Sequence, residues 1–167
     1  MNLKKNRAGF TMVELIIVIA IIAILAGIVF VAINPAKRFG EARDSRRWTD
    51  VSNLLDAILK YQVDNGGNLP VGVPAADGLN YLIGNGDCVI AGVTCNEGAT
   101  ILTGCKNLTE VTVPPTSIVP DYIGSIPTDL KGGTAAQTLY YISRSTADRI
   151  TIGACTPEYT KPISVTR

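Results

Sequence analysis

Histidine is absent from the sequence. Without it the chain cannot build a Ser-His-Asp or Cys-His catalytic group, a histidine-ligated metal site, or the usual acid–base group at neutral pH. The 15 Lys and Arg nearly balance 14 Asp and Glu, and this net charge of +1 does not support a nucleic-acid partner. At 167 residues the chain has the length of one domain.

Motifs of cofactor and metal chemistry are also missing. The carboxylates are scattered and form no calcium loop or glycosidase pair. Its glycine-rich stretches, such as residues 84–86, match neither a phosphate-binding loop nor a dinucleotide fingerprint. We therefore predict that the protein is not an enzyme, with no catalytic residue, metal or cofactor.

The cysteines suggest an oxidising compartment. Because none of the four stands in a C-x-x-C pair, a zinc or thioredoxin-like site is disfavoured. An even number of cysteines after an apolar N-terminal segment indicates two disulfides, for which three pairings are open. We expect a short loop closed by Cys88–Cys95, and a Cys105–Cys155 bridge that ties a late hairpin to the loop region.

Apolar residues are concentrated near the N-terminus. Residues 1–9 are short, polar and basic, whereas residues 15–33 are 19 positions without a charge. As a helix this run spans close to the hydrocarbon core of a bilayer, about 30 Å. A plain signal anchor would explain it. A secretory signal peptide would not, because the run is too long and no convincing cleavage site follows it.

One carboxylate, Glu14, stands at the head of this run. An ionisable residue in a membrane helix is costly and is by default a functional-site hypothesis. Gly9, between the basic and apolar segments, suits a protease that cuts on the cytoplasmic side. Cleavage there would make Phe10 the new N-terminus, and its amine could pair with Glu14 of a neighbouring subunit. Such pairs would set the stagger between identical helices.

Residues 4–15, with the apolar run that follows, closely resemble the class III signal of type IV pilins and pseudopilins. The resemblance implies cleavage between Gly9 and Phe10, and N-methylation of Phe10, by a prepilin peptidase. It also implies a single-pass precursor in the cytoplasmic membrane. An inner-membrane platform with an ATPase would assemble this precursor into a helical homopolymer at the cell surface. The strong match covers about residues 1–35.

The first half of the chain is predicted to be mainly helix. Gly27 and Pro35 are expected kink points, because glycine weakens a helix and Pro35 cannot donate a hydrogen bond. A helix end with a restart at Pro35 is the alternative. We expect four segments: a cleaved leader at 1–9, a membrane or filament-core helix at 10–35, its amphipathic continuation at 36–64, and a loop-rich head at 65–167.

The second part of the helix has an apolar face that begins only at Trp48. The residues of that face are Val51, Leu55, Ile58 and Leu59, with Leu54 at its edge. We therefore expect the head to cover the helix from Trp48 onward and residues 36–47 to form an exposed neck. Two i,i+4 charge pairs, Lys37–Glu41 and Arg46–Asp50, favour helix there. Residues 65–70, with two glycines and a proline, end it.

The head holds 13 of the 16 glycines and 8 of the 9 prolines, which is typical of turns and short strands. The clearest strands are residues 138–143 and 149–154, separated by residues 144–148; they predict an antiparallel hairpin packed on the helix. Short elements are expected around residues 89–93, 101–103 and 111–113. The predicted fold is thus α+β, a long N-terminal helix packed on a small antiparallel β-sheet head.

Two further head segments carry motifs. Residues 122–129 resemble the I-P-x-D segment of many pilin heads, although Leu130 stands where a proline is common. Asn107, Leu108 and Thr109 form a glycosylation sequon, a triplet that also arises often by chance.

We expect a structural subunit of a type IV pilus-like filament. A pseudopilin of a type II secretion-like system is the alternative within the family; the two expected disulfides and the lack of a calcium loop favour the pilin. A membrane-anchored adhesion or DNA-uptake module is the alternative from another class, but an anchor that never assembles has no use for Glu14.

Overall fold

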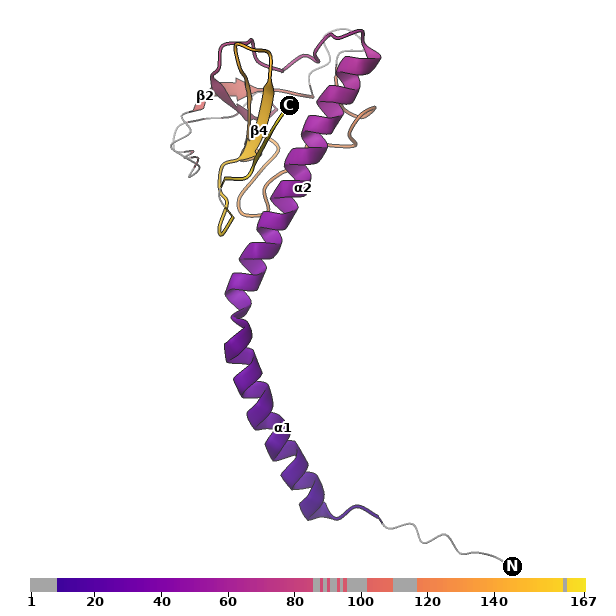
Figure 1. Ribbon diagram of the computed structural model, residues 1–167, viewed down its shortest axis with the longest axis vertical. Coiled ribbons are helices and arrows are strands. Elements are labelled where there is room, and N and C mark those ends of the chain that lie inside the picture. The colour runs from indigo at the N-terminus through magenta and orange to yellow at the C-terminus, as the bar shows by residue number, and fades with distance from the viewer. Residues whose placement is uncertain are drawn as a thin grey trace, which may run out of the picture. The chain divides into compact units, whose positions relative to one another are not determined.

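The computed structural model describes residues 9–85, 88, 90, 93, 95, 102–109, 117–160 and 162–167. The chain divides into two compact units, Met1–Phe39 and Gly40–Arg167 (Figure 1). The basic part of the predicted leader, residues 1–8, lies outside the described residues. So do the elements predicted around 89–93 and 111–113, apart from Ile90 and Val93, which are not in strands.

The first unit contains α1, Met12–Ile33, which has no buried residue. Apart from Glu14 in the first turn, its side chains are apolar on every side, so the helix has no polar face to mark a solvent side. Gly27 lies inside α1.

Asn34 interrupts the helix. It has φ 46° and ψ 77°, a left-handed conformation that ends α1 and that asparagine tolerates better than most residues. Its carbonyl then accepts hydrogen bonds from the N–H groups of Lys37 and Arg38, so that α2, Pro35–Asp64, begins at once. Of the two alternatives left open by the sequence, the structure shows a helix end with a restart at Pro35, where the missing N–H costs nothing.

The second unit, the head, joins most of α2 to a five-stranded sheet. The strands are β1 Asn80–Ile83, β2 Leu102–Lys106, β3 Tyr140–Arg144, β4 Ile150–Ala154 and β5 Ser164–Thr166, in the order β2-β1-β3-β4-β5. The predicted hairpin is confirmed as β3 and β4, and the element predicted around residues 101–103 overlaps β2. β1 and β5 were not predicted.

The α+β fold is confirmed, with one correction to the sheet. β1 pairs with β2 in parallel, whereas every other neighbouring pair is antiparallel. The sheet is therefore mixed. The sequences of two such short strands do not indicate whether they pair in parallel or antiparallel, because the connection between the strands decides their relative direction.

The main core lies between α2 and one face of the sheet. Val51, Leu54, Leu55 and Ile58 are fully buried there against strand residues such as Tyr140, Ile142 and Ile152. The predicted apolar helix face is thus confirmed, although Leu54 lies within it and not at its edge. α2 ends at Asp64, where the sequence predicted it, and Gly66 and Gly67 follow with positive φ angles of 65° and 92°.

A smaller cluster occupies the opposite face of the sheet. Because side chains alternate along a strand, Tyr141 and Leu82 point away from α2 and pack with the cysteines. The bridges there are Cys88–Cys105 and Cys95–Cys155. All four cysteines are therefore in disulfides, but the pairing expected from the sequence was wrong. Closeness along the chain does not decide which cysteines the folded sheet brings together.

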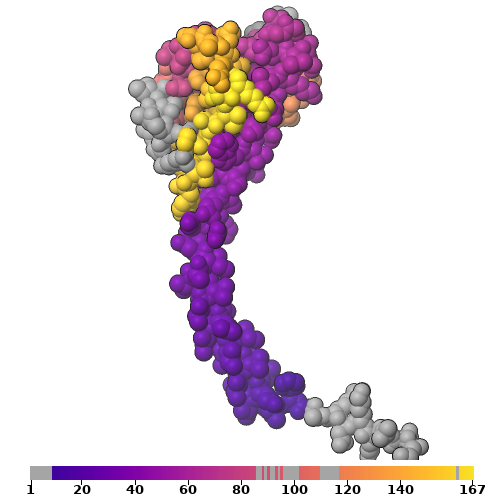
Figure 2. All heavy atoms as spheres, viewed as in Figure 1, coloured from indigo at the N-terminus to yellow at the C-terminus, as the bar shows by residue number. Residues whose placement is uncertain are grey.

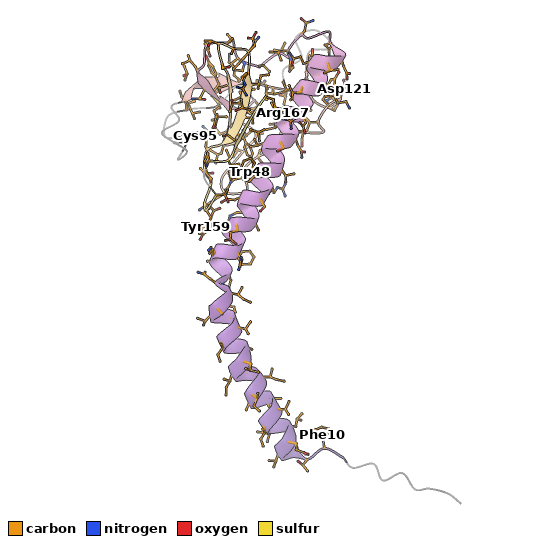
Figure 3. All side chains as sticks on the ribbon, in the orientation of Figure 1. Phe10, Trp48, Cys95, Asp121, Tyr159 and Arg167 are labelled. Carbon is orange, nitrogen blue, oxygen red and sulfur yellow. A yellow bond between two sulfur atoms is a disulfide. The ribbon has the colours of Figure 1, made fainter. Side chains whose placement is uncertain are left out.

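The expected neck at residues 36–47 must also be corrected. Gly40, Asp44 and Arg47 are buried by the rest of the head. Trp48, where cover was expected to begin, lies on α2 (Figure 3) and is 37% exposed. At Gly40 an added Cβ would clash with the ring of Tyr159, so this glycine lets the C-terminal segment lie against the helix. Figure 2 shows the C-terminal part of the chain, in yellow, against α2, in purple.

Candidate functional site

Two parts of the chain bring together polar or charged residues that are candidates for a functional site. They are the start of α1 and a cluster of ion pairs in the head. Phe10 lies just before α1 (Figure 3), and it and the preceding Gly9 are both exposed. No atom lies within 4 Å of the position that a Cβ of Gly9 would take, and Phe10 is 85% exposed. Among the described residues, therefore, none packs against the peptide bond predicted for cleavage.

Glu14 belongs to a capping box with Thr11. The Thr11 hydroxyl oxygen accepts the Glu14 N–H at 3.2 Å, and Glu14 Oε2 accepts the Thr11 N–H at 2.9 Å and its hydroxyl at 2.8 Å. Such a box satisfies two backbone donors that the helix start leaves unpaired. Among the described residues, none donates a hydrogen bond to the other carboxylate oxygen, Oε1.

The box holds the Glu14 carboxylate at the positive end of the helix dipole. It also keeps that carboxylate next to Phe10, which precedes Thr11 in the chain. The sequence identified Glu14 as a functional candidate but not Thr11 as its partner. The signal was nevertheless present, because a threonine followed three residues later by a glutamate before an apolar run is a helix-start pattern.

The helix that follows is long and apolar enough to cross a membrane, judged by length and composition. Its 22 residues span about 33 Å, close to the thickness of a hydrocarbon core. A helix that is apolar all round needs cover from lipid or from other helices.

The ion cluster was not predicted. It joins three segments of the head: the first head turns of α2, the loop at residues 129–131, and the C-terminal segment at residues 156–160. At its centre the Arg47 guanidinium is 2% exposed and donates to both oxygens of Asp129, at 2.5 and 2.9 Å. Its Nη1 also donates to Asp44 at 2.7 Å and to Glu158 at 3.2 Å.

Asp44 binds the C-terminal segment by its backbone. Its oxygens accept the N–H groups of Glu158, Tyr159 and Thr160 at 2.6–3.2 Å. Burial raises the pKa of Asp44, but these hydrogen bonds and the one from Arg47 outweigh it, so the pKa lies below its ordinary value.

Glu158 closes the cluster at its exposed rim. Arg43 donates to both of its oxygens at 2.6 Å, and Lys131 lies 3.4 Å away. The hydrogen bonds from Arg43 lower the pKa of Glu158 to about 2 against the cost of burial, with Arg47 helping. Burial lowers the pKa of Arg47, but hydrogen bonds to Asp129 and Asp44 raise it more. The shifted pKa values of Asp44, Glu158 and Arg47 all favour the charged form of the side chain.

The sequence contained only fragments of this arrangement. Asp129 ends the segment that resembles the pilin I-P-x-D motif, and it uses its carboxylate to hold Arg47. Asp44 and Arg47 look like ordinary charges on a solvated helix, because nothing near them in sequence reveals a covering segment. Of the predicted i,i+4 pairs, Arg46 and Asp50 lie 3.8 Å apart.

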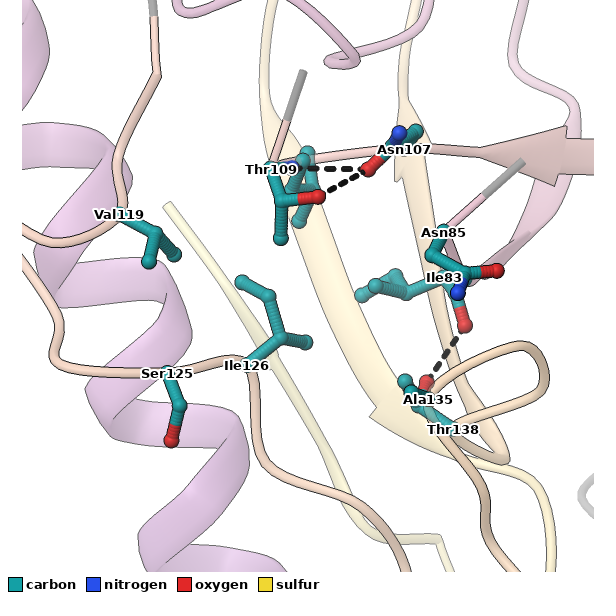
Figure 4. A pocket seen from close by; sticks show the side chains of 11 residues that line it. Ile83, Asn85, Asn107, Thr109, Val119, Ser125, Ile126, Ala135 and Thr138 are labelled. Atoms are coloured by element: carbon teal, nitrogen blue, oxygen red, sulfur yellow. Dashed lines mark hydrogen bonds between the residues drawn. The ribbon is translucent and has the colours of Figure 1, made fainter. Parts of the chain in front are cut away.

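A cavity of about 280 Å³ also lies in the head (Figure 4). Its lining is mainly apolar, with Ile83 and Ile126, and none of the described residues that line it is charged. Asn107 of the sequon lies on its wall, and Asn107 Oδ1 accepts hydrogen bonds from the Thr109 N–H and hydroxyl at 2.9 and 2.7 Å. Its described lining offers no acid–base pair, and we assign the cavity no function.

Comparison with known proteins bears on the N-terminal site. A family model, the prokaryotic N-terminal methylation motif, matches residues 4–30, which include Gly9, Phe10 and Glu14. No curated protein and no solved structure matches the chain significantly. The chain therefore carries the class III signal of type IV pilins at the start of an apolar helix, and it fits a membrane-anchored precursor of the pilin and pseudopilin kind.

Proposed function

We propose that the protein is the structural subunit of an extracellular type IV pilus-like filament. A prepilin peptidase cleaves it between Gly9 and Phe10 and methylates the amine of Phe10. The observation that carries the proposal is the methylation motif at residues 4–30, which overlaps α1, a helix with no buried residue. Copies of the same helix then replace the membrane around α1 when the subunit enters the filament.

The free-energy cost of exposing apolar surface to water explains why α1 must pack against lipid or other helices. Its large side chains, from Met12 to Ile33, are mostly half exposed or more in the single chain. Outside a bilayer, that much apolar surface drives association. A helical homopolymer satisfies every subunit with one repeated contact, because each helix covers its neighbours.

The capping box gives Glu14 a role in this assembly. It holds the carboxylate at the helix start, while Oε1 keeps room for a further donor. In a processed subunit the amine of Phe10 is such a donor, and between two copies it can reach the Glu14 of its neighbour. A charge left unpaired in an apolar environment is strongly unfavourable, so only the matching stagger of helices is tolerated.

The remaining partners follow from the class of signal. The peptidase acts first, and an inner-membrane platform driven by an ATPase then moves the subunit from the membrane into the filament. The same N-terminal site would serve a pseudopilin of a secretion system, whereas the anchor of an adhesion or DNA-uptake module would have no use for Glu14. Imaging of surface filaments, with mass spectrometry of their main protein, distinguishes these roles.

Two variants of Glu14 test the assembly step. Glu14→Leu removes the carboxylate, so the chain should still be cleaved and inserted but should not enter filaments. Glu14→Asp keeps the charge with a shorter reach and should assemble poorly without failing outright. The measurement, in cells without a wild-type copy, is the ratio of sheared extracellular subunit to membrane-retained subunit. Normal filaments from Glu14→Leu would refute the amine–carboxylate pairing.

A further inference from the structure

The two disulfides of the head cross each other along the chain. Cys88 pairs with Cys105 at a separation of 17 residues, and Cys95 pairs with Cys155 at a separation of 60. Cys95 therefore lies inside the loop that the first bridge closes, yet its own partner lies far outside that loop. Neither bridge joins cysteines that are neighbours in sequence order.

An unfolded chain favours other bridges. The probability of closing a loop falls roughly as the 3/2 power of its length, so Cys88–Cys95 forms about 4-fold more readily than Cys88–Cys105. The same scaling favours Cys88–Cys95 about 25-fold over Cys95–Cys155. Over all six possible pairs, about four-fifths of the first bridges would join Cys95 to Cys88 or Cys105.

Order of appearance strengthens this bias. When the head is translocated across the membrane in the order of its sequence, Cys155 is the last cysteine to reach the oxidising compartment. Cys88, Cys95 and Cys105 are exposed to the oxidant before it. A bridge between any two of them that uses Cys95 leaves Cys155 without its native partner.

The burial of the native pair explains why non-native bridges must be exchanged by a second molecule. In the folded head Cys95 is 6% exposed and Cys155 is fully buried, packed with Leu82 and Tyr141. Cys155 is positioned by the sheet, since it follows β4 directly and its N–H bonds to the Leu139 carbonyl. The native partners therefore meet only when the sheet forms, and a bridge made earlier is retained unless a free thiol attacks it.

We propose that the head is a substrate of a thiol–disulfide isomerase. A disulfide oxidant first makes two bridges, accepting two electrons for each, and these are mostly Cys88–Cys95 and Cys105–Cys155. An isomerase thiolate attacks the sulfur of Cys95, forms a mixed disulfide and releases the Cys88 thiolate. Cys88 attacks Cys105 and releases the Cys155 thiolate, which attacks Cys95 and frees the isomerase. Two bridges are exchanged for two others without net oxidation.

The test is oxidative refolding of the full chain in detergent from the reduced, denatured state. One sample receives oxidised glutathione alone, and the other receives protein disulfide isomerase with reduced and oxidised glutathione. Free thiols are blocked at intervals, and the bridges are identified by peptide mass mapping. About half of the first bridges formed with oxidant alone should be Cys88–Cys95. The isomerase should convert that population to the native pairs.

A variant with both Cys95→Ser and Cys155→Ser is the matched control. It retains Cys88 and Cys105, which have only each other to pair with inside the chain. The isomerase can therefore speed the closure of this bridge by thiol–disulfide exchange, but it cannot change which cysteines are joined. The proposal is overturned if the native pairs predominate among the first bridges in oxidant alone, or if the isomerase accelerates wild type no more than the control. Neither result depends on whether the protein forms filaments.

Discussion

The substitution Arg47→Met tests how much the ion cluster contributes to the free energy of unfolding of the head. Methionine keeps part of the apolar stem but removes the guanidinium that binds Asp129 and Asp44. Both carboxylates are almost completely buried, so the variant leaves two buried charges without the guanidinium that they share. Removing one partner of a buried ion pair in this way costs about 3–5 kcal/mol.

That loss is large beside the stability of a typical domain, which is about 5–15 kcal/mol. For a unit of the size of Gly40–Arg167, an unfolding entropy of about 2.1 cal/mol/K per residue means that each kcal/mol lowers Tm by about 4 °C. The expected loss for Arg47→Met is therefore about 11–19 °C.

Near-ultraviolet circular dichroism of the full chain in detergent measures this transition. All six tyrosines and the one tryptophan lie in the head, so their bands report its packing, whereas the three phenylalanines, all in the first unit, absorb at shorter wavelengths. Lys131→Met is the matched control, because Lys131 is a 63% exposed cation of the same cluster and its pair with Glu158 is worth about 0–1 kcal/mol.

A double variant separates the lost pair from the lost packing. Adding Asp129→Leu to Arg47→Met removes one of the stranded carboxylates, so the double variant should be more stable than the single one. If Arg47→Met unfolds within about 4 °C of wild type, as Lys131→Met should, the cluster is not a structural support and this reasoning fails.

Three more predictions concern processing, pH and the boundary of the head. Gly9→Leu puts a side chain at the open position before Phe10, so unprocessed precursor should accumulate in the membrane and filaments should be lost; a mature chain starting at Phe10, seen by mass spectrometry, would contradict the cleavage assignment. Because the pKa of Glu158 is lowered from 4.5 to about 2, its carboxylate stabilises the fold above pH 4.5, and this contribution is lost as the pH falls through 2. Glu158→Gln should therefore lose less stability than wild type over that acid range, measured by denaturant unfolding at each pH, and equal losses would count against the assigned role. A head that begins at Gly40 should fold as a soluble chain, whereas one that begins at Trp48 lacks the helix turns of the ion cluster and should be unstable; equal stability of the two fragments in thermal unfolding would contradict this.

The pairing of the cysteines shows where reasoning from sequence stopped. Their number indicated two disulfides, and both are present. Their spacing favoured Cys88–Cys95, because a short loop is the easiest to close in an unfolded chain. The folded sheet instead places the end of β4 beside Cys95, and no property of the neighbouring residues reveals that contact.

The sequence by itself determined the features that depend on neighbours along the chain. The methylation motif, the apolar run of α1, the buried face of α2 and the β3–β4 hairpin are all written in local spacing, which backbone geometry converts directly into structure. The tertiary structure alone decided the parallel β1–β2 pair, the crossed disulfides and the burial of Asp44 and Arg47. Each of these joins segments far apart in sequence. A charged residue on a helix is exposed or buried depending on whether such a distant segment packs over it, and the residues next to it in sequence do not reveal this.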